Sequence, residues 1–310
     1  MENAVTLGTA LTEAGFEVSQ ICCSRPSSFD FAARKSENLI LVKFHSDIDT
    51  FSPSDSRDLR VISGCVSAAS LLVSQRTHEK PLEDDTVYTR YSVFTVTAKT
   101  FENIALRGTN PLIHAGPGGY SVEIDAESIK KRRQELGLSI GKLAVMVGVS
   151  RRTLYGYERS MAKASVGSAY NLAKTLGIPV AQPINIFKKM KKQHQCLFVK
   201  AKHAISGKAL LKKIFRKFTL HDITAVRRAP FDFIIDLPKE NNVVIGGVAT
   251  GNELELDKRV DEILSLSRVF QAHPVLITEN QKPSNKDIFW IRKNELSQIR
   301  TPKDFIASFT

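Results

Sequence analysis

The segment 139–160, SIGKLAVMVGVSRRTLYGYERS, places the strongest constraint on what this chain can fold into. It predicts two short helices joined by a sharp turn at Gly148, where glycine adopts a positive φ without strain. Ser139 and Ser150 are placed to cap the two helices, because a serine hydroxyl accepts an otherwise unpaired amide at a helix start. The first helix has one apolar face at helical spacing, formed by Leu143, Ala144 and Val147. The segment therefore predicts a helix-turn-helix.

The second helix of this motif is expected to present a basic face. Leu154 and Tyr157 are predicted to point inward. The positions left outside are Arg151, Arg152, Thr153, Tyr155 and Gly156. An arginine at the exposed start of such a helix can form two hydrogen bonds with a guanine edge in the major groove. The pattern therefore favours a helix that reads double-stranded DNA.

Further helices are predicted on both sides of the motif. Asp125 is placed to cap a helix over 126–137, with Ile129 and Leu136 inside. Its cations, expected mostly outside and in contact with phosphates, are Lys130, Lys131, Arg132 and Arg133. Residues 165–177 predict another helix that ends at a glycine.

Residues 125–180 resemble the Cro/C1-type (lambda-repressor-like) helix-turn-helix domain, down to the GVS turn and the YER end. The resemblance implies that Arg151 and Arg152 touch bases. Ile140 departs from the family, which usually has a phosphate-binding glutamine there, so that contact is expected to be either absent or supplied by a neighbour such as Lys142. The expected DNA-binding residues are Ser139, Lys142, Ser150, Arg151, Arg152, Thr153, Tyr155, Gly156, Lys130, Lys131, Arg132 and Arg133.

The two flanks of the helix-turn-helix resemble each other. Residues 16–31 align without gaps to 218–233 and share an identical FDF triplet. The ordered series continues through LILVKF and VVIGGV, SLLV and PVLI, and TAKTF and TPKDF. Each copy predicts a helix (7–15 or 207–217), strands, a second helix (55–69 or 255–270) and a last strand. The apolar LILVKF and VVIGGV runs are typical of strands buried on both faces. We interpret the flanks as a duplicated α/β domain.

This order of elements resembles the restriction-endonuclease-like, PD-(D/E)xK fold. An active member of that fold has an Asp, a second acid and a Lys, which hold a metal and the reacting phosphate. Asp30 and Lys43 match the first and last positions of the first copy, but Leu41 replaces the middle acid. Asp47 and Asp49 are out of register as substitutes. In the second copy Asp232 remains, and the VVIGG strand supplies neither acid nor lysine. We therefore expect nuclease-like folds without nuclease chemistry, in which Asp30 and Asp232 accept hydrogen bonds from turn amides.

The predicted fold class is thus α/β plus all-α, with two degenerate nuclease-like domains flanking a helical bundle. The expected divisions are a first nuclease-like domain (1–110), a linker (111–124), the helix-turn-helix domain (125–182), a basic linker or strand (183–200) and a second nuclease-like domain (201–310). Segment 110–121, with its proline and two glycines, is expected to be a hinge. Segment 188–217 contains no acid and is expected to contact phosphates.

Bulk properties fit a polyanionic partner and an intracellular setting. The formal net charge is +12 and the pI is near 9.5, as in many nucleic-acid-binding proteins. Four cysteines without a CxxC pair favour reduced thiols in the cytoplasm. No run is long and apolar enough for a membrane span, and no cofactor or small-molecule effector is indicated.

Most of the chain, including the YSVEID lead-in to the helix-turn-helix, resembles an archaeal family of helix-turn-helix transcriptional regulators. The resemblance implies a DNA-binding regulator that is not an enzyme. A single helix-turn-helix reads only a few base pairs, so we also expect a homodimer on a two-fold site. The alternatives are a helix-turn-helix-targeted, metal-dependent nuclease that uses Asp30 and Lys43, or flanking domains that bind an effector or partner.

Overall fold

The fold was analysed in a computed structural model, which describes residues 2–78, 80–189, 222–237, 242–250 and 253–297. The chain divides into two compact units. The first comprises Met1–His45, Thr50–Leu72 and Phe187–Thr310, and the second comprises Ser46–Asp49 and Val73–Ile186. The predicted helix 207–217, most of the basic segment 188–217 and the TPKDF segment lie outside the described residues.

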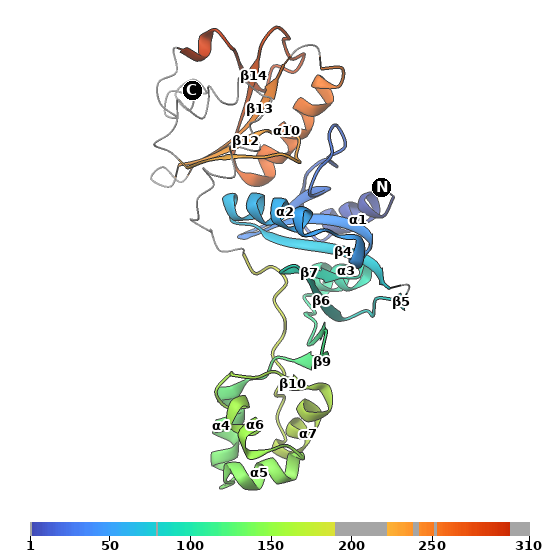
Figure 1. Ribbon diagram of the computed structural model, residues 1–310, viewed down its shortest axis with the longest axis vertical. Coiled ribbons are helices and arrows are strands. Elements are labelled where there is room, and N and C mark those ends of the chain that lie inside the picture. The colour runs from blue at the N-terminus through green and yellow to red at the C-terminus, as the bar shows by residue number, and fades with distance from the viewer. Residues whose placement is uncertain (1, 79, 190–221, 238–241, 251–252, 298–310) are drawn as a thin grey trace. The chain divides into compact units, whose positions relative to one another are not determined.

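The first unit begins with an α/β layer that follows the predicted order (Figure 1). Its elements are α1 (Glu2–Glu13), β1 (Glu17–Val18), β2 (Phe31–Lys35), β3 (Asn38–Asp47), a short 3-10 helix (Ile48–Thr50), α2 (Pro53–Cys65) and β4 (Ala69–Thr77). Strands β1, β2 and β3 are antiparallel neighbours, with Phe31 opposite Val42. Helix α2 starts at Pro53 behind the cap Ser52, whose side chain accepts the amide of Asp55.

The C-terminal part of the first unit repeats this arrangement around a second sheet (Figure 1). Its elements are β11 (Asp222–Ala225), β12 (Phe233–Leu237), β13 (Asn242–Ala249), α10 (Leu256–Phe270), β14 (His273–Thr278), β15 (Phe289–Arg292) and a 3-10 turn (Glu295–Ser297). Strands β11 to β13 are antiparallel, and β14 and β15 then continue parallel. Helix α10 makes the crossover between the parallel strands β13 and β14, as parallel pairing requires.

The apolar strand runs are buried as their sequences predict. Residues 39–42 of β3 and 244–249 of β13 are buried on both faces of their sheets. Gly246 is fixed by packing, because a Cβ at this position would overlap the ring of Phe233 on the neighbouring strand. A small residue in β13 is therefore what lets the second FDF phenylalanine lie flat against the sheet.

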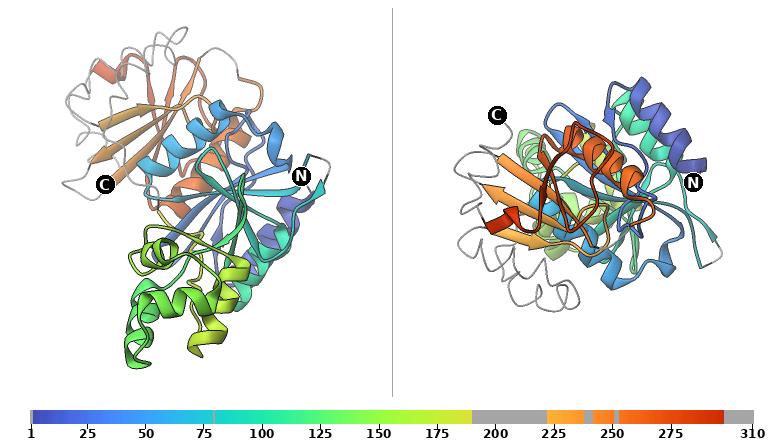
Figure 2. Two further views of the ribbon diagram at one scale, coloured as in Figure 1. Left: turned by 60° about the horizontal axis from the view of Figure 1, so that its bottom comes forward. Right: turned by 90° about the horizontal axis from the view of Figure 1, so that it is seen from above.

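The second unit carries short strands and the helical group. Its elements are β5 (Lys80–Pro81), β6 (Thr86–Arg90), β7 (Val93–Val96), α3 (Ala98–Arg107), β8 (Ile113–Gly116), β9 (Gly119–Val122), α4 (Ala126–Glu135), α5 (Ile140–Val147), α6 (Arg151–Tyr157), β10 (Ala164–Ser165) and α7 (Val166–Leu176). Helices α4 to α7 form one compact group (Figure 1 and Figure 2, left). None of the helices in the described ranges is long and apolar enough to cross a membrane.

The segment expected to be a hinge is a paired hairpin instead. Within it, β8 and β9 are antiparallel, with Gly116 opposite Gly119 at the turn. Strand β8 also pairs in parallel with β6, and β9 pairs with β10. Because main-chain hydrogen bonds hold both strands, the glycines serve a tight turn rather than a free joint.

Candidate nucleic-acid interface

The helix-turn-helix is built from local caps at the predicted positions. The Ser139 hydroxyl accepts the amide of Lys142 at 3.1 Å, and the Ser150 hydroxyl accepts the amide of Thr153 at 3.0 Å. Gly148 ends α5 with a φ of 78°, in the left-handed region that favours glycine. These contacts fix where α5 stops and where α6 begins.

A small apolar core holds the two helices together beneath this turn. Leu143 and Val147 of α5 and Leu154 and Tyr157 of α6 are buried in it, together with Ile129 of α4. Leu136 is the exception to the predicted core, since 43% of it is exposed. Helix α4 ends just before it, Gly137 turns the backbone to a positive φ, and Leu138 packs against the core instead.

The outward face of α6 carries the expected DNA-reading side chains. Arg151, Arg152 and Tyr155 are exposed, while Thr153 and Gly156 are half-buried. The Arg159 guanidinium lies 4.6 Å from the centroid of the Tyr155 ring. Sequence reasoning did not single out Arg159, which lies in the turn just after α6 ends at Tyr157.

Arg151 is also positioned by a neighbour outside α6. A Cβ built at Gly141, in the first turn of α5, would lie 3.3 Å from Nε of Arg151. The Arg151 side chain therefore rests against the start of α5, where a larger residue would displace it. Neither sequence spacing nor helical periodicity links these two positions, because they meet only across the turn.

Arg133 does not belong to the exposed basic set. It is 9% exposed, and its Nε and Nη2 donate to the two carboxylate oxygens of Glu158 at 2.5 and 3.0 Å. Its Nη1 donates to the carbonyl of Leu138. Hydrogen bonding to Glu158 raises the pKa of Arg133. The expectation that Arg133 lies outside is therefore wrong, and its role is to join α4 to the end of α6.

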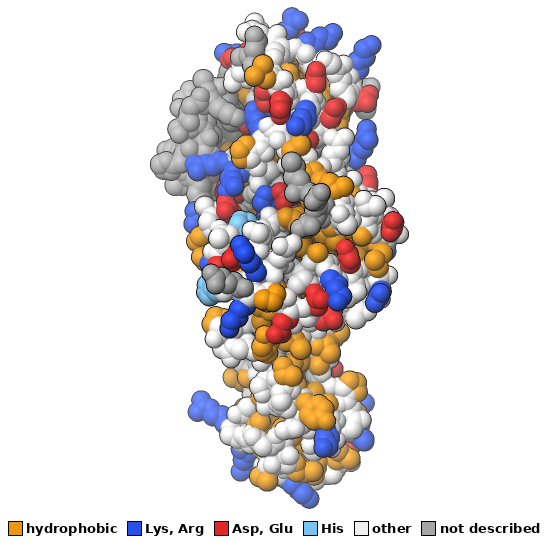
Figure 3. Space-filling model, turned by 90° about the vertical axis from the view of Figure 1, so that its right-hand side faces the viewer, with side chains coloured by type: hydrophobic (Ala, Val, Ile, Leu, Met, Phe, Trp, Pro, Cys, Tyr) orange, Lys and Arg blue, Asp and Glu red, His pale blue; other side chains and the backbone are white. Residues whose placement is uncertain are grey.

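The remaining predicted cations differ in solvent exposure and in their hydrogen-bond partners. Lys130, Lys131 and Lys142 are exposed. Arg132 is half-buried, because its Nε donates to the carbonyl of Leu176 and its Nη1 to Glu135. Basic side chains project from the surface of the helical group α4 to α7, where acidic side chains are sparse (Figure 3). This face suits a polyanion.

The site of the first nuclease-like copy is a closed ion pair. Asp30 Oδ1 accepts a hydrogen bond from Lys43 Nζ at 2.7 Å, and Oδ2 accepts the amide of Phe44 at 2.7 Å. Both side chains are about 20% exposed, and Leu41, at the position of the missing acid, is buried. Asp49 is occupied elsewhere, because its carboxylate accepts the Thr77 hydroxyl.

The C-terminal copy places its aspartate in the same backbone frame. The amide of Asp30 donates to the carbonyl of Val42, and that of Asp232 donates to the carbonyl of Gly246, both at 2.7 Å. The carboxylate of Asp232 accepts the amide of Val248 at 2.7 Å. These amides belong to neighbouring strands, so the expected donors were correct in type but do not lie in turns. In this register Gly247 occupies the position of Lys43.

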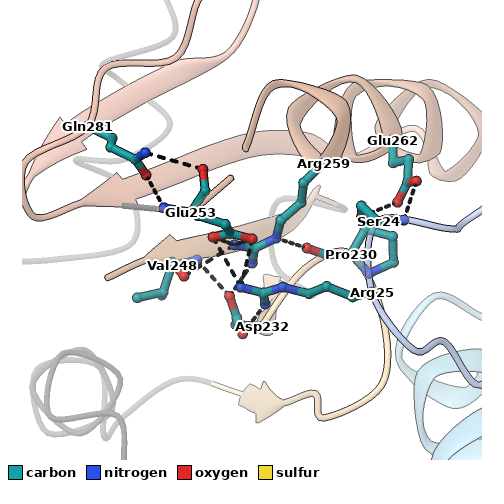
Figure 4. A network of polar contacts seen from close by, with 9 residues as sticks. All are labelled: Ser24, Arg25, Pro230, Asp232, Val248, Glu253, Arg259, Glu262 and Gln281. Atoms are coloured by element: carbon teal, nitrogen blue, oxygen red, sulfur yellow. Dashed lines mark hydrogen bonds and ion pairs between the residues drawn. The ribbon is translucent and has the colours of Figure 1, made fainter. Parts of the chain in front are cut away.

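An arginine from α10 fills the space that this glycine leaves (Figure 4). Arg259 is fully buried, pairs with Asp232 and Glu253, and donates to the carbonyl of Pro230 at 2.5 Å. A second guanidinium, Arg25, comes from the first copy and lies 3.1 Å from both acids. Sequence reasoning missed both partners, because one lies on a helix and the other over 200 residues away.

These contacts leave little room for metal chemistry at the second aspartate. A buried carboxylate with two guanidinium partners and one amide has about three of its roughly four acceptor sites occupied, and both its oxygens are engaged. Across the described ranges no three His, Cys, Asp or Glu side chains gather where they could hold a metal ion.

Comparison with known proteins assigns two segments to families. Residues 3–111 match the PD-(D/E)XK superfamily domain, and residues 129–182 match a helix-turn-helix. Among solved structures, a chain of a SinR protein/SinI protein complex is 22% identical over 30% of this chain, with a TM-score of 0.16, which supports no argument.

Full-length relatives come from several archaea. A protein of Methanosarcina acetivorans is 30% identical, and one of Methanosarcina barkeri is 31% identical. Each alignment covers 96% of this chain and 92% of the relative. A protein of Archaeoglobus fulgidus is 27% identical over 96% of this chain and 93% of its own length. All three carry the name "Putative HTH-type transcriptional regulatory protein".

Proposed function

Since the chain belongs to the archaeal family of HTH-type transcriptional regulatory proteins, we propose that it binds specific sequences of double-stranded DNA and controls transcription without catalysis. The observation that carries this proposal is the exposed N-terminal turn of α6. There Arg151 and Arg152 project from a helix whose start is capped and whose other face is anchored in a core. A rigid helix with free arginines at its start is suited to reading base edges.

The roles of the individual residues follow from their exposure. Arg151 and Arg152 contact base edges, and Thr153 and Tyr155 contact the backbone or a thymine methyl. Phosphates are held by the exposed lysines Lys130, Lys131 and Lys142. The helix starts capped by Ser139 and Ser150 hold further phosphates. Arg132 contributes at most partly to phosphate binding. Arg133 affects DNA binding only indirectly, because it fixes the position of α6.

The flanking parts are two degenerate copies of one nuclease-like domain, spanning about 1–110 and 201–310 around the DNA-binding domain at 125–182. The matching registers of Asp30 and Asp232 support this duplication. The copies also contact one another within the first unit, where the Phe29 and Phe231 rings lie 6.5 Å apart. The amide of Ser28 donates to the carbonyl of Arg228. Such pairing leaves other surfaces for a homodimer, which a two-fold operator requires.

The second candidate is a nuclease targeted by the helix-turn-helix. The PD-(D/E)XK match and the intact Asp30–Lys43 pair favour it. Against it stands the single carboxylate of that site, because Mg²⁺ prefers a compact set of oxygen ligands. In the second copy the guanidinium groups of Arg25 and Arg259 occupy the carboxylate of Asp232, which also disfavours metal binding there.

A gel shift on end-labelled upstream fragments, with and without Mg²⁺, distinguishes the two candidates. Discrete shifted bands of intact DNA that fade as salt rises are expected for a regulator. Shortened fragments that require the metal and vanish in a Lys43→Ala variant would establish the nuclease instead.

Two variants then test the assigned roles on the operator obtained in this way. Arg152→Ala should cost about 1–3 kcal/mol and relax base preference at one position. Lys142→Ala should weaken all sequences alike, because a phosphate contact carries no sequence information. An Arg152→Ala variant that loses affinity equally for every sequence would reassign that arginine to the backbone.

A further inference from the structure

Two exposed cations of the C-terminal copy, Lys282 and Arg292, lie beside one aromatic ring. Four other basic side chains in the described part of this copy are matched by acids. These pairs are Arg228 with Asp55, Lys258 with Glu255, Arg259 with Asp232, and Lys293 with Glu279. By contrast, five exposed cations of this copy enter no ion pair within the described residues, namely Arg227, Arg268, Lys282, Lys286 and Arg292.

Trp290 lies beside two of these cations, Lys282 and Arg292. It is half-buried on β15, at the edge of the five-stranded sheet. Lys282 Nζ lies 6.0 Å and the Arg292 guanidinium carbon 5.6 Å from its ring centroid. Trp290 and Arg292 are two residues apart on a strand, so they share a face. We name Trp290, Lys282 and Arg292 the tryptophan patch.

Two like charges held beside one ring are an unfavourable arrangement unless something offsets their repulsion. A cation over an exposed aromatic ring gains only about 0.5–1 kcal/mol, and mutual repulsion opposes that gain. An anionic ligand with more than one charge would offset it. The acids Glu295 and Asp287 lie nearby in sequence, and Glu295 accepts the amide of Arg292, so the patch is modestly basic. Such a patch adds to another contact rather than binding alone.

We infer that the tryptophan patch is a second contact to the DNA backbone, which lets the C-terminal nuclease-like copy hold DNA although its aspartate is sealed by arginines. Lysine and arginine beside an aromatic ring are the side chains that follow a phosphate backbone without reading bases. This inference rests on the proposed function for the identity of the polyanion. It extends that function by giving the sheet edge of the second copy a share of the affinity.

The chain offers a direct probe, because Trp290 is its single tryptophan. The full-length protein would be titrated with a fluorescein-labelled duplex of arbitrary sequence, while tryptophan fluorescence and DNA anisotropy are recorded together. Both signals are expected to change with one midpoint and to reverse with added salt. In a Lys282→Ala/Arg292→Ala variant the fluorescence response should be lost and the salt slope should fall by about 2, because each phosphate contact contributes about 0.9. Referred to 1 M salt, a slope difference of about 1.8 corresponds at 0.1 M salt to an affinity loss of roughly 60-fold.

The matched control is Arg268→Ala, which removes an exposed cation of the same copy away from the patch and should leave both signals unchanged. A circular dichroism spectrum equal to that of the parent protein shows that the double variant is folded. DNA binding by anisotropy with silent tryptophan fluorescence and an unaltered salt slope would overturn the inference and leave the proposed function standing. Failure to bind any duplex would overturn both. A fluorescence response to polyglutamate but not to DNA would assign the patch to an acidic polypeptide and overturn it.

Discussion

Gly156 lies in α6, the proposed DNA-reading helix, at a position where the fold does not require glycine. Its φ is not in the left-handed region, and a Cβ built there would meet only Ala162 Cβ, at an ordinary 3.8 Å. A glycine in a helix is about 0.5–1 kcal/mol less stable than an alanine. Gly156→Ala should therefore stabilise α6 by this amount.

The same methyl group is expected to harm DNA binding. In the proposed complex a base edge approaches the bare backbone at Gly156, next to Arg152 on the exposed face. An additional methyl in a tightly packed contact costs about 1–3 kcal/mol. This corresponds to about a 5- to 150-fold loss of operator affinity. The variant should thus be more stable and yet bind more weakly.

Two measurements read these opposite effects separately. Amide hydrogen exchange across α6 should slow by about 2- to 5-fold, as 0.5–1 kcal/mol of local stability requires. Operator affinity is measured by fluorescence anisotropy at fixed salt. Gly8→Ala in α1 is the matched control, because its Cβ would also meet one side chain at 3.8 Å. That variant should stabilise its own helix and leave DNA affinity unchanged. Undiminished operator affinity of Gly156→Ala would refute the close approach of a base edge to Gly156. Faster amide exchange across α6 would refute the inference that a Cβ fits at this position.

Three further variants test the packing that supports these surfaces. Glu158→Ala should destabilise the helical group by about 3–5 kcal/mol, because it leaves the Arg133 charge buried without a partner, and urea unfolding followed by α-helical circular dichroism measures it. Gly246→Ala should lower the stability of the first unit by about 1–3 kcal/mol through overlap with the Phe233 ring, and an unchanged urea midpoint would contradict that contact. Hydrogen bonds from the amide and hydroxyl of Ser128 lower the pKa of Asp125, so its contribution is complete above the unfolded pKa near 4 and is lost as pH falls through the folded value. Asp125→Ala should therefore cost about 1 kcal/mol at pH 7 and less at pH 2, and an equal cost at both pH values would rule out the charged cap.

The helix-turn-helix was predictable in detail because its signals are local. The caps at Ser139 and Ser150, the turn at Gly148 and the helix end at Gly177 each depend on hydrogen bonds or dihedral angles within a few residues. Such features are written in short stretches of sequence. The exposure of Arg151, Arg152 and Tyr155 followed from helical periodicity, whereas Arg132 is half-buried and Arg133 is buried.

The prediction of a hinge at the glycine-rich segment 110–121 was wrong because it used local sequence signals only. Gly118 and Gly119 predict a turn, but the sequence does not state whether the flanking residues are paired. Strand β8 finds its partner in β6, which lies more than twenty residues earlier along the chain. A composition typical of a flexible joint therefore forms a hydrogen-bonded hairpin.

The sequence by itself determined the helices of the helix-turn-helix group, the buried apolar strands β3 and β13, and which arginines begin α6. These properties arise from backbone preference and side-chain periodicity, which act over one or two turns. Only the tertiary structure decided the partners of the charged groups. Arg133 meets Glu158 across 25 residues, and Asp232 meets Arg25 across 207. A buried charge is stable only with a partner in direct contact, and that partner is chosen by how the elements pack in space.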